Sequence, residues 1–254
     1  MKPTFVFLFL AITSLSGQMA WAQTTTAEAA ASATHSIASS HFEAAYNMAS
    51  LSVGGVKLSA AAKQVMHDQI LQGFSQDADF QELEQEFPGV TVAMVDTFVP
   101  VAIRQTEETM PALIERLARL YAEKMTAEEI AVATEWYSSP AYSRINAIME
   151  SNMDLSQIIR KSIADSDSQV SDKDLEAMNQ NSAAQSVSAM ELADRSVLMQ
   201  FSATSAFAKI EALKPKSLMI EAEWTNEDNP DHDAELENLT IRVLEEFTGM
   251  DLSE

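Results

Sequence analysis

The spacing of apolar residues constrains this chain more than any other feature of its sequence. From residue 42 onward, apolar side chains recur three and four positions apart, which places them on one face of an α-helix. Leu113, Leu117, Leu120 and Tyr121 are one such run. Only 6 glycines and 7 prolines occur in 254 residues, and strand patterns are scarce. We therefore expect an all-α protein, built as a bundle of antiparallel helical hairpins.

Two predicted helix starts share one capping pattern. Thr126 stands three positions before Glu129, so that its hydroxyl and the carboxylate can each satisfy a free backbone amide. Ser171 and Asp174 repeat the pair 45 positions later. The repeat is consistent with a degenerate internal duplication and equally with a chance likeness between short capped helices. The sequence leaves both interpretations open.

Glycine and proline mark the other expected boundaries. The pairs at 54–55 and 88–89 predict turns. Pro100 predicts a kink or a boundary. Pro140 suits the first turn of a helix, because its missing amide proton would have no partner there. The apolar spacing from Val187 predicts one long amphipathic helix that ends near 214–215.

Composition and charge suggest three parts in the chain. We expect residues 41–165 to form a helical domain, 166–220 a helical extension or degenerate repeat, and 221–254 an acidic loop and helix. The last part holds twelve acidic residues and a single arginine, a net charge of −11. Its apolar residues keep helical spacing up to Gly249, a suitable C-cap. This pattern predicts a docked helix after a loop at 226–230.

The first 22 residues have the three parts of a cleavable secretory signal peptide. Lys2 supplies the positive charge, residues 5–12 form an apolar run, and small residues precede a cut after Ala22. We expect the mature protein to be periplasmic or secreted. Residues 23–40 are rich in Thr, Ala and Ser, and a flexible N-terminus is predicted there.

We expect no membrane anchor in the mature chain. The most apolar later stretch, 90–103, is shorter than the roughly 20 residues that span a bilayer and contains Asp96 and Pro100. The sequence has no cysteine, which excludes disulfides, thiolate metal sites and an acylated cysteine tether.

The net charge is strongly negative. Removing Lys2 with the signal peptide leaves 15 basic and 38 acidic residues, a net charge of −23. Such a surface repels phosphate groups, so nucleic acid is not an expected partner. High negative charge can also serve only to keep an exported protein soluble.

The sequence contains no motif that names a reaction. The four histidines, His35, His41, His67 and His232, lack the spacings of helical metal sites. A Gly-x-Ser-x-Gly turn and phosphate-binding loops are missing. Acidic residues in 228–237 offer oxygen ligands, yet without a glycine-centred calcium loop they favour a solvated helix N-terminus. We predict no catalytic residue, metal or cofactor.

The most distinctive cluster is aromatic. Tyr121, Trp136, Tyr137 and Tyr142 fall within 22 residues, around Pro140. Aromatic rings with polar tips can line a binding groove, so these five residues are the candidate binding site. Packing of a helix hairpin would explain the rings as well.

At this cluster the chain resembles the bacterial domain-of-unknown-function family 2059, whose members are exported helical proteins. The resemblance is carried by 121–130 and by 136–141, where an aromatic pair precedes Ser-Pro, with weaker similarity across 90–150. It implies a helical periplasmic protein and supplies no activity, ligand or catalytic residue. We predict a non-catalytic envelope module that binds a protein partner or a small ligand. The alternative is an envelope hydrolase whose carboxylates are assembled by the fold.

Overall fold

The computed structural model describes residues 39–165, 168–249 and 251. Within these residues the chain forms eleven α-helices and no β-strand, which confirms the all-α class. The helices are α1 (Ser39–Ser52), α2 (Ala60–Gln76), α3 (Ala78–Glu86), α4 (Val90–Lys124), α5 (Ala127–Tyr137), α6 (Pro140–Ser151), α7 (Ser156–Ala164), α8 (Asp172–Ala189), α9 (Leu192–Ser202), α10 (Ser205–Thr225) and α11 (Pro230–Thr248). The predicted signal peptide and residues 23–38 lie outside the described residues, whereas residues 39 and 40 begin α1.

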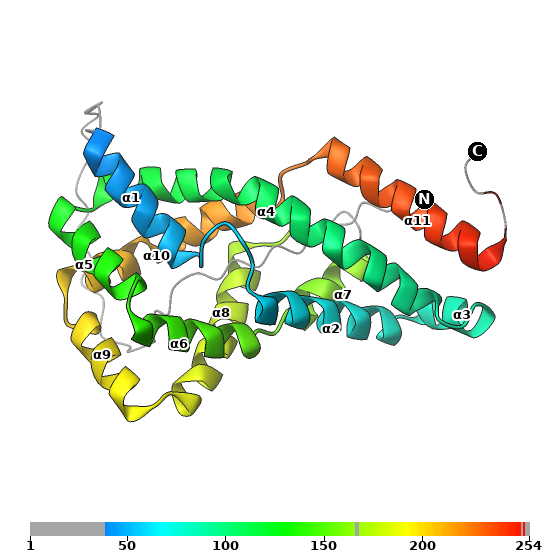
Figure 1. Ribbon diagram of the computed structural model, residues 1–254, viewed down its shortest axis with the longest axis horizontal. Helices are drawn as coiled ribbons and strands as arrows, with labels where there is room; N and C mark the ends of the chain where they lie inside the picture. The colour runs from blue at the N-terminus through cyan, green and yellow to red at the C-terminus, as the bar shows by residue number, and fades with distance from the viewer. Residues whose placement is uncertain (1–38, 166–167, 250, 252–254) are drawn as a thin grey trace.

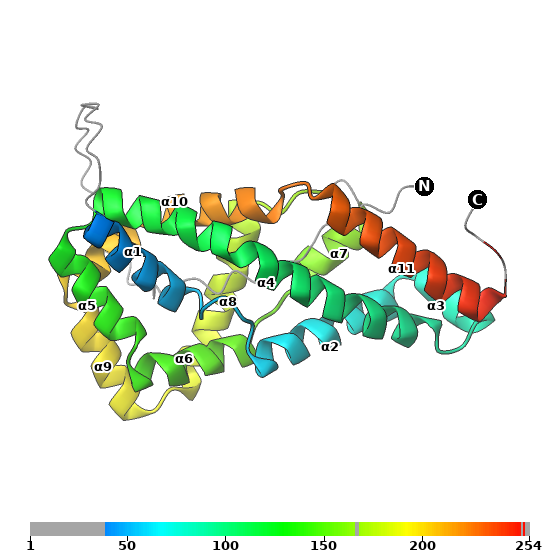
Figure 2. The same cartoon turned by 45° about the horizontal axis from the view of Figure 1, so that its top comes forward.

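The 35-residue helix α4 runs along the long axis of the molecule (Figure 1). Its N-terminal half packs against α2, α3 and α11, and its C-terminal half packs against α1 and α10. Helices α1, α5 and α9 lie at one end of the molecule, and α3 lies at the other (Figures 1 and 2). The helix continues through Pro100 and Pro111, both exposed, so Pro100 is not a helix boundary, and the alternative prediction of a kink stays a prediction.

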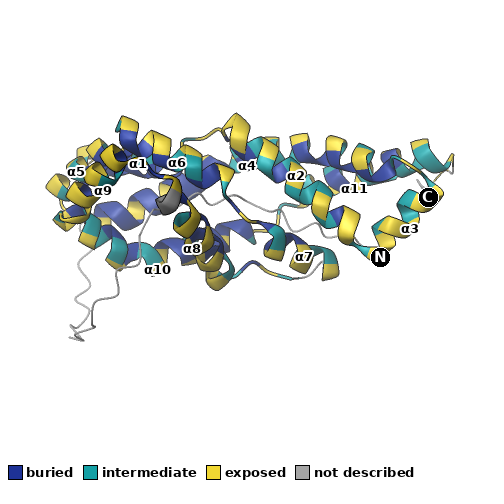
Figure 3. Ribbon diagram, turned by 90° about the horizontal axis from the view of Figure 1, so that it is seen from below, coloured by how far each residue is buried: buried dark blue, intermediate teal, exposed yellow. Residues whose placement is uncertain are grey.

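Buried apolar residues form three clusters along this axis, on the inward faces of the helices (Figure 3). The largest joins α1, the C-terminal half of α4, α5, α6, α9 and α10. A second lies mainly between α2, α7, α8 and α10. The third joins α2 and the N-terminal half of α4 to α11. The predicted three-part division of the chain stays a prediction, and α10 runs across its boundary at 220.

Most predicted helix boundaries are confirmed. Thr126 and Ser171 both form complete capping boxes, at the starts of α5 and α8. Pro140 occupies the first turn of α6, and Gly249 ends α11 in the left-handed conformation. The glycine of the 88–89 pair, at φ 95°, is the N-cap of α4. The two capping boxes begin helices of different length, 11 and 18 residues. The internal duplication and the antiparallel hairpin arrangement both stay predictions.

The long helix predicted from Val187 to 214–215 is wrong. Met190 and Glu191 are extended and separate α8 from α9. Thr204 then begins α10, because its side chain accepts a hydrogen bond from the amide of Phe207 at 3.2 Å. Helix α10 continues past Pro215, which is exposed. A uniform apolar spacing therefore concealed two breaks, and between them lies a short separate helix.

Helices α2 and α7 approach each other closely at Gly73. A β-carbon at this position would lie 2.5 Å from Cγ2 of Ile159 and 3.4 Å from Cδ1 of Ile163. Only glycine fits this contact without movement of α7.

In the described part of the chain, no single helix is both long and apolar enough to cross a membrane. Helices α3 and α4 meet that criterion only as a pair, across a bend of 118°.

Candidate interaction surface on helix α9

The aromatic residues predicted as a binding site lie mainly in the core. Tyr121, Trp136, Tyr137 and Tyr142 are 2 to 6% exposed, whereas Pro140 is exposed at the start of α6. The ring of Tyr142 meets those of Tyr137 and Trp136 edge-on, with centroids 4.9 and 5.7 Å apart. The structure thus brings the four rings together as packing. Their role in binding stays a prediction.

The tyrosine hydroxyls are held as neutral groups. Tyr142 donates a 3.0 Å hydrogen bond to the carbonyl of Ser52, at the end of α1. Burial, together with the neighbouring carboxylate of Glu221, raises the pKa of Tyr121 to about 12. Burial likewise raises the pKa values of Tyr137 and Tyr142. At neutral pH these phenols are therefore protonated, and the Tyr142 hydroxyl joins α6 to the end of α1.

Among the described residues, no three His, Cys, Asp or Glu side chains are placed to hold a metal ion. His41 contacts the carbonyl oxygen of Ala122 at 3.0 Å, and His67 bonds to Asp96 at 2.8 Å. The fourth histidine, His35, lies outside the described residues.

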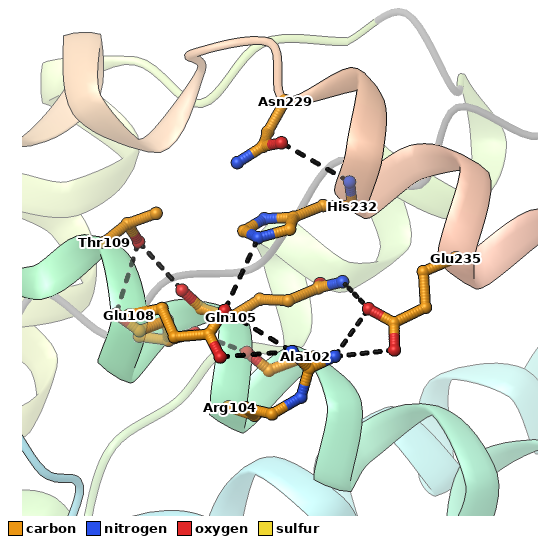
Figure 4. A network of polar contacts seen from close by, with 9 residues as sticks. Ala102, Arg104, Gln105, Glu108, Thr109, Asn229, His232 and Glu235 are labelled. Carbon is orange, nitrogen blue, oxygen red and sulfur yellow. Dashed lines mark hydrogen bonds and ion pairs between the residues drawn. The ribbon is translucent and has the colours of Figure 1, made fainter.

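The remaining histidine, His232, belongs to a polar network between α4 and α11 (Figure 4). Arg104 donates to Glu108 at 3.1 Å and to both oxygens of Glu235 at 2.5 and 2.6 Å. Gln105, fully buried, donates to the same Glu235 at 3.0 Å. These bonds hold the pKa of Glu235 below its usual range, with Arg104 the main cause. The network fixes the predicted C-terminal helix on α4.

Helix α9 carries the most exposed apolar residues of the described chain. Leu192 is 83% exposed, Met199 67% and Val197 38%. Ala193 and Ser196 are exposed on the same helix. We call these five residues the α9 surface. Large apolar side chains this exposed are unusual on one short helix, and clusters of them mark interaction sites.

The opposite side of α9 is held by polar and aromatic contacts. Asp194, only 2% exposed, accepts two hydrogen bonds from Arg144 of α6, at 2.6 and 3.0 Å. This guanidinium holds the pKa of Asp194 below its usual range. Phe201 stacks on Trp136 with centroids 4.8 Å apart and an interplanar angle of 9°. The Asp194 carboxylate therefore faces inward, whereas Leu192 and Met199 face the solvent. The inward contacts of Asp194 and Phe201 hold α9 in this orientation.

The α9 surface also lies in a long stretch of the chain that is not acidic. Residues 177–220 contain four basic and three acidic residues, a net charge of +1. The rest of the mature chain has eleven basic and 35 acidic residues, a net charge of −24. The segment that carries the α9 surface is therefore much less negative than the rest of the mature chain taken together.

Together, the fold and these contacts define an all-α protein with an apolar surface on a short helix. The model of the bacterial family DUF2059, described as an uncharacterized protein conserved in bacteria, matches residues 111–165. The resemblance seen in the sequence is thereby confirmed over the C-terminal part of α4 and through α5, α6 and α7. Comparison with curated proteins and with solved structures gave no significant match.

Sequence reasoning missed the α9 surface because α9 was absorbed into a longer predicted helix. Leu192 and Met199 are seven positions apart, so they belong on one face of a helix, and apolar residues on one face are ordinarily assigned to the core. The signal that the sequence offered was a charged residue between these two apolar residues. Asp194 lies between them on the chain, and its partner Arg144 is 50 residues away, so the fold alone shows that the carboxylate faces inward.

Proposed function

We propose that this protein is an exported, non-catalytic helical module that assembles with another protein chain through the α9 surface. The single observation that carries the proposal is the exposure of Leu192 and Met199, at 83% and 67%, on a helix whose polar side is anchored. Burying these side chains in a partner would stabilise the complex by roughly 25 cal/mol for each Å² of apolar area removed from water.

A protein partner fits this surface better than a nucleic acid or an anionic lipid does. The net charge of −22 repels both of those, even where one local stretch is near neutral. The signal-like first 22 residues support an envelope location, periplasmic or secreted, and the resemblance to an exported bacterial family agrees with it.

Site-specific photo-crosslinking tests the interaction in cells that export the full chain. A benzophenone amino acid is placed at Leu192 in one variant and at Val92 in a control. Val92 is 47% exposed on α4, far from α9 in the chain, so the control probe is also exposed to solvent but at a different place. We expect a defined crosslinked protein band from position 192 alone, and loss of that band on adding Met199→Glu. Identical bands from both positions, or none from 192, would contradict the proposal.

The N-terminus of the exported protein tests its location. Mass spectrometry of the protein recovered from the periplasm or medium should show a chain that begins near Gln23. An intact Met1 on the recovered protein would contradict signal-peptide cleavage.

A further inference from the structure

We propose that the chain bound at the α9 surface is a second copy of this protein, with the two α9 helices antiparallel about a two-fold axis. This inference rests on the proposed function, because it names the partner of the same surface. It follows from the register of α9 and from the charge distribution of the whole chain.

The exposed residues of α9 match themselves in one antiparallel register. Leu192 and Met199 are two helical turns apart and lie about 10 Å from each other along the axis. In an isologous dimer each contact occurs twice, so Leu192 packs on the partner's Met199 while Met199 packs on the partner's Leu192. The axis then passes between Arg195 and Ser196.

The residues around this axis permit close approach. Ser196 is small and exposed. Arg195 is turned back along its own chain, where its Nε donates to the carbonyl of Met190 at 3.1 Å. In the same register Glu191 lies opposite the partner's Gln200, and Arg195 lies opposite the partner's Ser196. The buried Asp194 is already paired with Arg144 and adds no exposed charge.

Charge disfavours a basic partner at the α9 surface and permits a second copy there. A basic partner would be drawn to the acidic parts of the chain, which carry a net charge of −24, and would gain little from α9. Two identical acidic chains can meet with little repulsion through residues 177–220, where the net charge is +1. The most exposed apolar residues lie inside this stretch.

The area available predicts a weak dimer. Stable interfaces bury about 800 Å² on each partner, and an 11-residue helix with three large exposed apolar side chains offers less. The dimer should therefore form in a concentration-dependent way. Added salt should strengthen it, because screening reduces the repulsion between the acidic surfaces.

Analytical ultracentrifugation of the purified mature protein tests for self-association. We expect a monomer–dimer equilibrium whose dimer fraction rises with protein and salt concentration. Leu192→Glu and Met199→Lys should each weaken the dimer at least tenfold, whereas the control Val92→Glu should not change it. Circular dichroism should show each exposed-site variant to be folded. A monomer at every concentration, or a dimer indifferent to Leu192→Glu, would overturn the proposal.

Mixing variants tests the register itself. A mixture of Leu192→Glu with Met199→Lys places the introduced glutamate opposite the introduced lysine and should restore the dimer. Val197→Lys lies at a different register position, so its mixture with Leu192→Glu should not restore it. Equal rescue by both lysine variants would overturn the antiparallel register.

Disulfide crosslinking gives an independent readout, because the chain has no cysteine of its own. Ser196→Cys next to the axis should form an intermolecular disulfide under mild oxidation, since disulfides need Cα atoms about 4.4 to 6.8 Å apart. Ser75→Cys, on the exposed side of α2, is the control and should crosslink much more slowly. Crosslinking at equal rates would overturn the proposal.

The photo-crosslinking of position 192 separates the two hypotheses. A crosslink to this same chain supports both of them. A crosslink only to a different protein overturns the dimer and leaves the proposed function standing, and the absence of any crosslink at 192 overturns both.

Discussion

Replacing Trp136 by alanine should strongly destabilise the protein, because this ring joins three helices. Trp136 is 6% exposed, stacks on Phe201 of α9 at 4.8 Å and meets Tyr142 of α6 edge-on at 5.7 Å. Truncating a buried tryptophan to alanine costs about 3 to 5 kcal/mol of unfolding free energy, from lost burial and the remaining cavity. The contact with Phe201 should account for about 0.5 to 1.5 kcal/mol of that loss.

Urea denaturation followed by far-ultraviolet circular dichroism measures this loss. Trp224 is the tryptophan that remains in the mature variant, and it lies on α10, 3% exposed, so its fluorescence gives a second probe of the same transition. The free-energy contribution of the contact between Trp136 and Phe201 is measured as the coupling energy in a double-mutant cycle of Trp136→Ala with Phe201→Ala.

A loss below about 1 kcal/mol would refute the packing role. A folded Trp136→Ala variant that keeps its stability and loses a ligand would support the binding interpretation of the aromatic residues. Trp136→Ala should also weaken the proposed dimer, because the substitution removes a contact that holds α9 in place.

Three further predictions concern helix contacts elsewhere. Gly73→Ala should lower the unfolding free energy by about 1 to 3 kcal/mol through overpacking, despite the better helix propensity of alanine. Denaturation should show that this loss is smaller when Gly73→Ala is made in an Ile159→Ala background, where Cγ2 is absent. An unchanged loss would contradict the contact. Tyr142→Phe should cost about 1 to 3 kcal/mol in the same assay, because a buried carbonyl at the end of α1 loses its donor, and no loss would contradict that bond. The hydrogen bond to Asp96 raises the pKa of His67 in the folded state, so the stabilisation from this pair is fully present below the unfolded-state pKa and is lost as the pH rises through the folded-state pKa. The stability difference between the protein and its Asp96→Asn variant, under about 1 kcal/mol for this partly exposed pair, should therefore shrink with rising pH. A difference that grows with pH would contradict this prediction.

The starts of α5, α6 and α8 were predictable from sequence because their signals are local. Thr126 and Glu129 form the expected capping box, since both partners lie within one helical turn. Pro140 begins α6 for an equally local reason, its missing amide proton. Pro100 shows the limit of such rules. Packing of α4 on both sides of this residue holds the helix together, and the sequence around Pro100 does not reveal this packing between distant segments.

The candidate surface could not be located from sequence because its orientation depends on residues far away in the chain. The aromatic cluster was identifiable as a group, yet its burial follows from α1, α9 and α10 closing around it. For α9 the same apolar spacing suits a buried face or an exposed one. The choice is made by Arg144, whose bond to Asp194 turns the carboxylate inward.

The matched segment and the α9 surface have different parts in the proposed interaction. Residues 111–165 include Trp136 and Arg144, two side chains that contact α9, whereas α9 itself lies outside the match. A frame that fixes a short helix by one stacked ring and one ion pair constrains its inner side and leaves its outer side free to vary. Under the proposal, the outer residues of α9 determine which chain is bound, and the matched segment determines where that helix is presented.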